Sequence, residues 1–379
     1  MAQLSVVRSP HEEALALSRS LPAGGPAPGR YWKIDANNLD VDALAIGTVE
    51  PAVELEPSAA QRGVIASDLA AATRENPRIA EFENSAVDWR RSKFAALNAA
   101  HRAGTCIFVP SGVAVQEPIV LRYRLRGQAV FPYTLIVVGE GSKATVLIRF
   151  DAARDVSLVS EVVEAIVADG AELECVVVQD LPDSVRVFSS RRGNVERNAE
   201  LRWAIAELGA DVSVGDVRST LRAEGAQTAI SGVFFPCGSQ HVSLESEADH
   251  PARETISQTL FKSAAAGDGQ AHFIGNIRIR PAAHGVDATL RDDALLLSKT
   301  AHIDSIPALE IGANDVKAYH GATIGALDAD ELFYTMSRGI ARADAERLIT
   351  LGFFEPAIAR FPTEALREEL RAKLAGKIA

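Results

Sequence analysis

Gly170-Ala171-Glu172-Leu173 is a turn-to-strand junction, in which a small residue opens a turn and an apolar run to Gln179 follows. Junctions of the same form begin at Ser142, Asn198 and Gly225. In chain order the four starts are separated by 28, 28 and 27 residues. A fixed period of ~20–50 residues is typical of stacked repeats, and strands at such a period without intervening helices predict the coils of a β-helix. The alternative is that Gly-Ala and Asn-Ala turns recur by chance in an alanine-rich chain.

Short β-branched runs separated by Gly, Asp and Asn fill the chain from Thr105 to about Ala318. The predicted strands are Cys106–Val109, Pro118–Tyr123, Tyr133–Val138, Ala144–Phe150, Leu173–Gln179, Leu201–Ala206, Thr228–Phe235 and Phe273–Arg280. The pattern predicts no amphipathic helix among them. Such a region is expected to be a sandwich, a barrel or a solenoid, and the repeat favours the solenoid.

The N-terminal part of the chain has helical patterns. We expect helices over His11–Ser20, from about Ser67 as the N-cap, and over Asp88–Ala103. Gly104 stands where the last of these helices should end. Leu21–Gly29 is rich in Pro and Gly and therefore predicts a flexible linker.

The C-terminal part is again helical in pattern. One helix is expected from the N-cap Asp328 to Gly339, a second from about Asp344 to Gly352, and a third from Pro362 onward. The apolar stripe of the first consists of Leu332, Phe333 and Met336. The predicted domains are an N-terminal helical region (1–103), a β-helix core (104–325) and a C-terminal helical domain (326–379). The predicted fold class is therefore mainly β with helical ends.

The composition argues against two classes of partner. The chain has 379 residues, with 39 Lys and Arg against 50 Asp and Glu, so its formal charge is −11. A surface of this sign repels phosphate backbones and anionic lipids, so we expect neither nucleic-acid nor membrane binding. Hydrophobic residues at 47% and charged residues at 23% are ordinary globular values.

Three cysteines are too few for a disulfide framework, and no two of them form a CxxC pair. Cys106 and Cys175 lie within apolar strand runs and are expected to be core residues. Cys237 lies in a turn and could be reactive, although a structural role is favoured. Met1–Pro10 does not resemble a signal peptide, and no apolar run reaches 18 residues. These features predict a cytoplasmic protein.

Motifs of several enzyme classes are missing. The sequence contains no GxxxxGK[ST], no GxSxG and no HExxH, and no GxGxxG that precedes a helix. We therefore expect no nucleotide hydrolysis and no Rossmann-type dinucleotide binding.

Six of the eight histidines fall between residues 241 and 320. Neutral imidazole is a common ligand of iron and zinc. His284, His302 and His320 are each 18 residues apart and could stack on adjacent coils. The alternative is that the histidines are scattered on the surface or at strand edges. His320 is the exception, because Gly321 and Ala322 leave its imidazole uncrowded.

Three blocks of the sequence resemble the SufB/SufD family of iron–sulfur cluster assembly scaffolds, and the SufD type more closely. The first block is Lys93–Asn98 with Gly104, Val109–Val113 and Pro118-Ile119. The second is Gly238–His241, Asp249-His250, Leu260–Lys262 and Phe273–Ile277. The third is Leu295–Ser298, Pro307–Ile311, Val316–Thr323, Leu332–Tyr334, Ser337–Ile340 and Gly352-Phe353. The third block, with His-Gly-Ala-Thr, Leu-Phe-Tyr and Ser-Arg-Gly-Ile in this order, is the most specific.

The resemblance implies a right-handed parallel β-helix between helical domains. It also implies a cytosolic complex with SufB and two copies of the SufC ATPase, in which clusters form on delivered sulfur. SufB would carry the sulfur-accepting cysteine, and the imidazole of His320 would face SufB at a nascent cluster site. SufC would dock on the C-terminal helices, for which the candidate residues are Phe333, Tyr334, Met336 and Arg338.

The residues around His320 distinguish the two types. SufB-type chains have a Glu-His-Glu-Ala segment here, whereas His320 lies between Tyr319 and Gly321, as in SufD-type chains. One departure is that many SufD chains have Cys-Ser before the histidine, and this chain has Ala318-Tyr319. No thiol is available there, so His320 is the candidate iron or cluster ligand.

The resemblance thus implies a non-catalytic scaffold that holds a transient iron–sulfur cluster at an interface. Reduced flavin is possible for the complex, and no cofactor is expected to bind tightly to this chain alone. A homodimer is possible when the chain is isolated. Two alternatives remain: a SufB-like homodimeric scaffold that works with SufC alone, and a β-helix polysaccharide lyase, for which 6% aromatic residues leave little sugar stacking.

Overall fold

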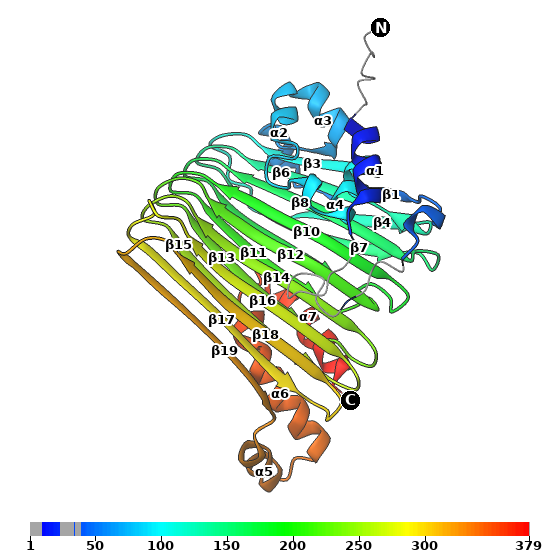
Figure 1. Ribbon diagram of the computed structural model, residues 1–379, viewed down its shortest axis with the longest axis vertical. Helices are drawn as coiled ribbons and strands as arrows, with labels where there is room; N and C mark the ends of the chain where they lie inside the picture. The colour runs from blue at the N-terminus through cyan, green and yellow to red at the C-terminus, as the bar shows by residue number, and fades with distance from the viewer. Residues whose placement is uncertain (1–9, 23–33, 35–38, 379) are drawn as a thin grey trace.

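The computed structural model describes residues 10–22, 34 and 39–378. Its centre is a parallel β-helix, which confirms the predicted fold class (Figure 1). One sheet contains, in spatial order, β1 (Thr48–Glu54), β4 (Ile119–Arg126), β7 (Lys143–Ala152), β9 (Glu172–Gln179), β11 (Glu200–Glu207), β13 (Gln227–Phe234), β15 (Ile256–Ala265), β17 (Val286–Leu296) and β19 (Val316–Ala326).

The second sheet faces the first. In spatial order it contains β18 (His302–Ile311), β16 (Gln270–Ile279), β14 (His241–His250), β12 (Val212–Leu221), β10 (Arg186–Val195), β8 (Leu158–Val167), β6 (Pro132–Val138), β3 (Ala103–Val109) and β2 (Ile65–Asp68). The short strand β5 (Ala129–Val130) also pairs with β8. From β3 to β19 every pairing between described strands is parallel, and each coil takes one strand to each sheet. The predicted division into domains stays a prediction.

The predicted repeat is real, with one shift in alignment. Strands β7, β9, β11 and β13 are neighbours in one sheet, and their first residues, Lys143, Glu172, Glu200 and Gln227, are paired in register. The turn residues before them are Gly141, Gly170, Asn198 and Gly225, all with positive φ. The first junction therefore begins at Gly141 and not at Ser142. A left-handed conformation suits glycine and is tolerated by asparagine.

Inward rows of apolar side chains fill the lumen between the sheets. Side chains at equivalent positions of paired strands share one face, so the register defines each row. One row consists of Ile119, Val146, Cys175, Trp203, Ile230, Thr259 and Leu290, all of them buried. Full burial of one such aliphatic side chain contributes ~1.5–3 kcal/mol.

The two ends of the β-helix differ. At the N-terminal end, β1 pairs with β4 and β2 pairs with β3, both antiparallel, and these two strands cover the first coil. At the C-terminal end, β18 and β19 are the outermost strands of their sheets among the described residues. Ile311 and Ile324, in inward rows of these strands, are each 45% exposed. The last coil therefore leaves the lumen open.

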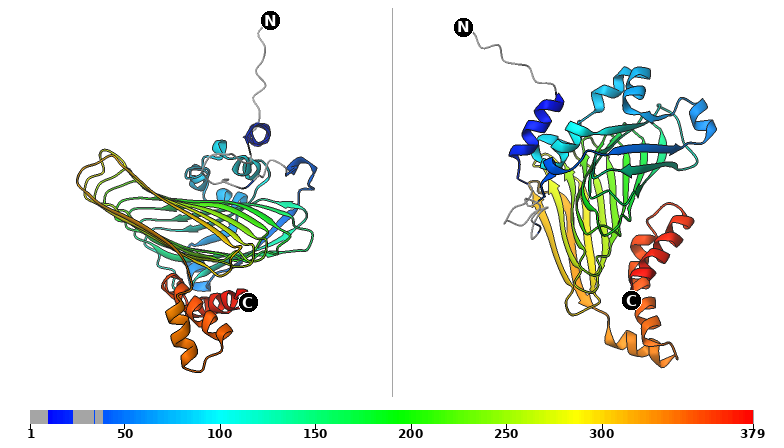
Figure 2. Two further views of the ribbon diagram at one scale, coloured as in Figure 1. Left: turned by 60° about the horizontal axis from the view of Figure 1, so that its bottom comes forward. Right: turned by 90° about the vertical axis from the view of Figure 1, so that its right-hand side faces the viewer.

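Helices cover the outer faces of both sheets (Figure 2). They are α1 (Pro10–Ser20), α2 (Pro57–Gln61), α3 (Leu69–Glu75), α4 (Lys93–His101), α5 (Ala329–Ser337), α6 (Arg342–Ile358) and α7 (Glu364–Lys377), with short 3-10 helices at Val41–Ala43, Pro77–Phe82 and Trp89–Arg91. Helices α1, α3 and α4 pack with β6 and β8 of the second sheet. Helices α6 and α7 pack with β9, β11 and β13 of the first sheet. Among the described helices none has the length and apolarity of a membrane span.

Several predicted helix boundaries are wrong. The N-cap of α3 is Asp68, whose carboxylate accepts the backbone N–H of Ala71, while Ser67 is in β2. Gly104 lies within β3 and does not end α4. Helix α6 continues through Gly352 and contains Pro356. Most of the predicted linker, from residue 23 onward, lies outside the described residues.

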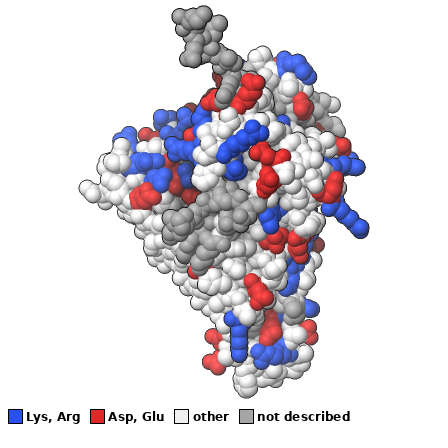
Figure 3. All heavy atoms as spheres, turned by 45° about the vertical axis from the view of Figure 1, so that its right-hand side comes forward, with Lys and Arg blue, Asp and Glu red and all other residues white. Residues whose placement is uncertain are grey.

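The surface charges are interspersed. On the face shown in Figure 3, Lys and Arg side chains stand among Asp and Glu side chains. Many form ion pairs across neighbouring coils, such as Arg280 with Asp249 at 2.9 Å and Lys143 with Glu172 at 2.7 Å. Exposed pairs of this kind contribute ~0–1 kcal/mol each, so they do little for stability.

Candidate functional site

His320 lies in β19 at the open end of the β-helix. Its register partner in β17 is the buried Leu290, so its imidazole continues the inward row that begins at Ile119. The residue is half-buried, and its Nδ1 atom is buried without a hydrogen-bond partner. The preceding inward position in β19 is Ala318, next to Ala288 of β17. The structure therefore places an imidazole, and no thiol, where the lumen opens.

The predicted stacking of His284, His302 and His320 is wrong. His284 lies in the turn between β16 and β17, and His302 and His320 belong to different sheets. The rings that meet are those of His241, His272 and His302, with centroid distances of 4.8 Å and 6.1 Å. An 18-residue spacing misses the register because successive strands of one sheet are about a full coil apart.

The three meeting histidines lie on the outer face of the second sheet, away from the lumen. Asp304 Oδ2 is 2.8 Å from His272 Nδ1 and 3.1 Å from His302 Nε2. Nevertheless, no three His, Cys, Asp or Glu side chains in the described part of the chain are grouped so that they could hold a metal ion. A metal bound at His320 therefore needs further ligands from outside this chain.

None of the cysteines is an activated thiolate. Cys106 and Cys175 are buried in hydrophobic clusters, as predicted, and burial raises the pKa of Cys106 to about 12 and that of Cys175 further. Cys237 is half-buried, and its thiol donates to the backbone oxygen of Lys377 at 3.6 Å. Burial raises the pKa of Cys237 as well, although Lys377 opposes the shift. Thiolate is the form that binds metal, so these thiols are poor ligands near neutral pH.

A second polar group, which the sequence analysis missed, lies beside His320. Asp292 of β17 is in an inward row, between the buried residues Leu290 and Ala294. Burial raises the pKa of the Asp292 carboxyl to about 7; nearby Asp293 adds to the shift, and the Ser305 hydroxyl opposes it. The signal in the sequence is an acid at a position where alternation from Val286 and Ala288 predicts an apolar residue.

The adjacent Asp293 points outward and is fully paired. It accepts hydrogen bonds from Lys262 Nζ at 2.7 Å, Arg291 Nε at 2.8 Å and the Thr323 hydroxyl at 2.5 Å. Burial alone would raise its pKa, but these donors, Lys262 first, hold the pKa below its usual range. Asp293 thus fastens the last coil to the coil before it, at Thr323, three residues beyond His320.

The predicted docking residues on α5 are exposed. Phe333 is 74% exposed, Tyr334 60% and Met336 39%, whereas Leu332 is the buried residue of the helix. Arg338 Nη2 donates to the Tyr334 hydroxyl at 2.8 Å, and its guanidinium lies 4.9 Å from the centre of that ring. A groove of about 980 Å³ between α5, α6 and the last coils is lined by Leu296, Leu327, Phe333 and Met336 among others. These side chains are therefore free to contact a partner.

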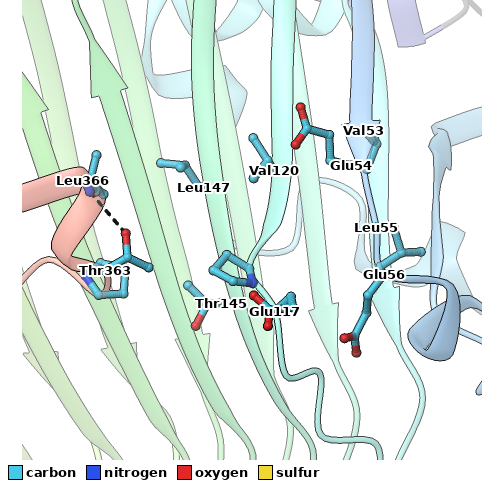
Figure 4. A pocket seen from close by; sticks show the side chains of 12 residues that line it. Val53, Glu54, Leu55, Glu56, Glu117, Val120, Thr145, Leu147, Thr363 and Leu366 are labelled. Carbon is cyan, nitrogen blue, oxygen red and sulfur yellow. Dashed lines mark hydrogen bonds between the residues drawn. The ribbon is translucent and has the colours of Figure 1, made fainter. Parts of the chain in front are cut away.

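A groove of about 610 Å³ lies near the other end of the β-helix, between β1, β4, β7 and the start of α7 (Figure 4). Three carboxylates, Glu54, Glu56 and Glu117, line it, and Thr363 accepts the Leu366 N–H at its edge. It contains no histidine or cysteine. We assign the candidate site to His320 and not to this groove.

His250 is a structural histidine. It is fully buried, with Nδ1 2.8 Å from the Thr255 hydroxyl and Nε2 2.9 Å from the Ser257 hydroxyl. Burial lowers its pKa to about 4, although nearby Asp249 opposes the shift. The folded chain therefore keeps this ring neutral where the unfolded chain protonates it.

Acid is expected to destabilise the protein through His250. Between pH 6.5 and 4 the unfolded state binds the proton more tightly, so this contribution is complete above pH 6.5 and is lost as the pH falls. The loss is about 3 kcal/mol. Urea unfolding at pH 7.5 and pH 4.5 should show a smaller difference for His250→Gln than for the unchanged chain. Equal pH dependence in the two proteins would contradict this assignment.

Comparison with known proteins agrees with the fold and with the placement of His320. The family model "SUF system FeS cluster assembly, SufBD core domain" matches residues 122–353. An iron–sulfur cluster assembly SufBD family protein of Staphylococcus epidermidis is 28% identical over 316 residues, which cover 82% of this chain and 68% of that protein. The iron–sulfur cluster assembly protein SufB of Bacillus subtilis is 28% identical over 309 residues, which cover 80% of this chain and 66% of the relative. The chain belongs to the SufBD family of iron–sulfur cluster assembly proteins.

Proposed function

We propose that this chain is a SufD-type, non-catalytic scaffold subunit that pairs with a SufB-type subunit through the open end of its β-helix. The observation that carries this proposal is the contrast between the two ends. Antiparallel strands cover the N-terminal end, whereas β18 and β19 are sheet edges in the described structure. Ile311, Ile324 and the imidazole of His320 are left at the mouth of an apolar lumen.

Such an end needs a partner of a particular shape. Long edge strands present rows of backbone N–H and C=O groups that readily pair with another strand. The strands β18 and β19 span 10 and 11 residues, and the lumen between them is apolar. A second β-helix of the same family has the same two edges and the same spacing between sheets. It is therefore the partner that completes both sheets and covers the lumen at once.

The residues at the mouth favour the SufD role. Ala318 stands where a thiol would face the lumen, and the three cysteines lie elsewhere with raised pKa values. The partner must then supply the sulfur-accepting thiolate, while His320 supplies a neutral imidazole nitrogen that iron accepts. The cluster is cargo that forms between the subunits. ATP hydrolysis belongs to a SufC subunit docked at α5, and any reduced flavin belongs to the complex.

The alternative is a SufB-like homodimer of this chain. The similarity to a relative named SufB keeps it in view. Both arrangements use the open end and differ only in the identity of the second chain. The polysaccharide lyase finds no support among the relatives.

An aspartate at Ile324 is expected to abolish pairing. The side chain is inward and 45% exposed in this chain, and a second coil would bury it. Burial of an unpaired carboxylate costs several kcal/mol, so Ile324→Asp should weaken pairing at least ~100-fold. The matched control is Leu348→Asp on α6, which is 57% exposed and away from the mouth. Co-expression with a tagged SufB-type chain, followed by size-exclusion chromatography with light scattering, measures the effect.

The same measurement on the chain alone separates the alternatives. A stable homodimer that forms in preference to the mixed pair would favour the SufB-like scaffold. A mixed pair that survives Ile324→Asp at full yield would exclude the open end as the interface.

A further inference from the structure

The lumen becomes polar in its last two coils. Each of three inward polar residues follows an apolar residue in the same row of the preceding coil. His320 follows Leu290, Asp292 follows Phe261, and Ser305 of β18 follows Phe273. All three of these preceding residues are fully buried. The change is therefore confined to the open end, where packing of the β-helix interior alone would favour apolar side chains.

These polar groups lack partners within the described chain. Both carboxylate oxygens of Asp292, the hydroxyl oxygen of Ser305 and Nδ1 of His320 are buried without a hydrogen-bond partner. The Ser305 hydroxyl lies close enough to influence Asp292 but does not complete a hydrogen bond. A buried polar group without a partner costs ~1–3 kcal/mol, and a charged one costs more. The sequence maintains this cost at one place in the lumen, which indicates that something else binds there.

The three groups converge from three strands. Asp292 pairs with Ala322, two residues beyond His320 on the same face, so Asp292 and His320 are diagonal neighbours on adjacent strands. Such neighbours have Cα atoms ~7–8 Å apart, a span that a carboxylate and an imidazole can bridge through one metal ion. Neither Gly321 nor Ala322 has a side chain large enough to stand between them. Ser305 approaches from the facing sheet.

We propose that Asp292 binds iron together with His320, so that this chain contributes a carboxylate oxygen and an imidazole nitrogen to a divalent iron site at the mouth of the lumen. This donor pair suits iron, since imidazole and carboxylate are both common Fe(II) ligands. Binding displaces water from the ion and releases the carboxyl proton wherever Asp292 is protonated. The inference rests on the proposed function for the source of the remaining ligands, which come from the partner.

The test uses the complex of the full chain with a SufB-type subunit, purified without oxygen. Equilibrium dialysis with Fe(II) measures affinity, and the visible absorption of bound Co(II) reports a change in the donor set. Asp292→Asn keeps the shape of the side chain and removes its charge. It should weaken Fe(II) binding at least tenfold and change the Co(II) spectrum, as His320→Ala should. The matched control is Asp287→Asn, on the exposed face of the same strand, which should bind Fe(II) like the unchanged complex.

The outcomes separate the two proposals. If Asp292→Asn binds Fe(II) and Co(II) like the unchanged complex while His320→Ala does not, Asp292 is not a ligand and the proposed function stands. If the unchanged chain forms no complex with the SufB-type subunit, the proposed function fails instead. Thermal unfolding checks the fold, and Asp292→Asn should not lower the melting temperature, because it removes a buried charge that lacks a partner. A large drop would show that Asp292 is structural and would overturn the inference.

Discussion

Replacement of Arg191 with methionine is expected to destabilise the protein by ~3–5 kcal/mol. Arg191 is fully buried in an inward row of β10. Its Nε and Nη2 atoms donate to Glu161 Oε2 at 3.0 Å and 2.7 Å, and its Nη1 atom donates to Glu207 Oε1 at 2.5 Å. Glu161 is in β8 of the same sheet and Glu207 is in β11 of the facing sheet, so the guanidinium joins the two sheets across the lumen.

The size of the effect follows from what the substitution leaves behind. Without Arg191, two buried carboxylates lose their counter-charge in an apolar lumen. Burial already raises the pKa of Glu161 even with Arg191 beside it. Glu207 keeps two neutral donors, the Gln179 amide at 3.1 Å and the Ser213 hydroxyl at 3.0 Å. Most of the loss therefore comes from Glu161, whose second oxygen has no hydrogen-bond partner.

Urea unfolding at pH 7.5 measures this loss. The combined variant Arg191→Met, Glu161→Leu and Glu207→Gln should recover most of the stability, because it removes the stranded charges along with the arginine. Arg202→Met on the outer face of β11, where the side chain is 36% exposed, is the matched control and should change stability by ~1 kcal/mol or less. A single variant Arg191→Met as stable as the unchanged protein would show that the network contributes nothing.

The same network explains which strands the sequence could predict. The strands β7, β9, β11 and β13 were predicted because apolar residues occupy most of their inward positions. Their neighbours in the second sheet, β10, β12 and β14, were missed. In β10 the inward positions include Ser189 and Arg191, and in β12 they include Ser213, so alternation of apolar and polar residues does not show. Only the register reveals that these polar residues face a lumen.

The helix boundaries failed for a different reason. Gly352 and Pro356 are helix breakers, and in an exposed helix they cost ~1 and ~3 kcal/mol. Helix α6 nevertheless continues, because Phe354 and Ile358 are fully buried against the first sheet in the same segment. Such tertiary packing outweighs local propensity and cannot be read from a short window of sequence. Gly104 was assigned to a helix end for the same local reason, although it belongs to the first parallel strand.

The candidate site was predictable in part. His320 stands out in the sequence because of its small neighbours and the family resemblance, but its inward direction depends on the pairing of β19 with β17. Asp292 could have been noticed as an acid in phase with Val286, Ala288 and Leu290. Its lack of a hydrogen-bond partner depends on side chains from two other strands, and no sequence pattern contains that information.

Loss of the two exposed aromatic side chains on α5 is expected to abolish docking of the SufC ATPase. Aromatic and arginine side chains carry most of the binding energy at protein interfaces, with ~2 kcal/mol or more for each hot spot. Phe333 and Tyr334 are 74% and 60% exposed, and Arg338 holds the Tyr334 ring through a hydrogen bond and a cation–π contact. The double variant Phe333→Ala and Tyr334→Ala should therefore weaken SufC binding by ~100-fold or more.

Point variants test this dock more sharply than removal of the C-terminal helices. Deletion of residues 326–379 would also remove α6 and α7, which cover Val176, Ala204 and Phe235 of the first sheet, so the β-helix itself would lose its cover. Phe333 and Tyr334 contribute little to the fold, because Leu332 is the residue through which α5 packs. Tyr319→Ala is the matched control, since this tyrosine is 65% exposed on β19 at the other proposed interface. Isothermal titration of SufC into each variant decides the outcome, and full affinity in the double variant would place the dock elsewhere.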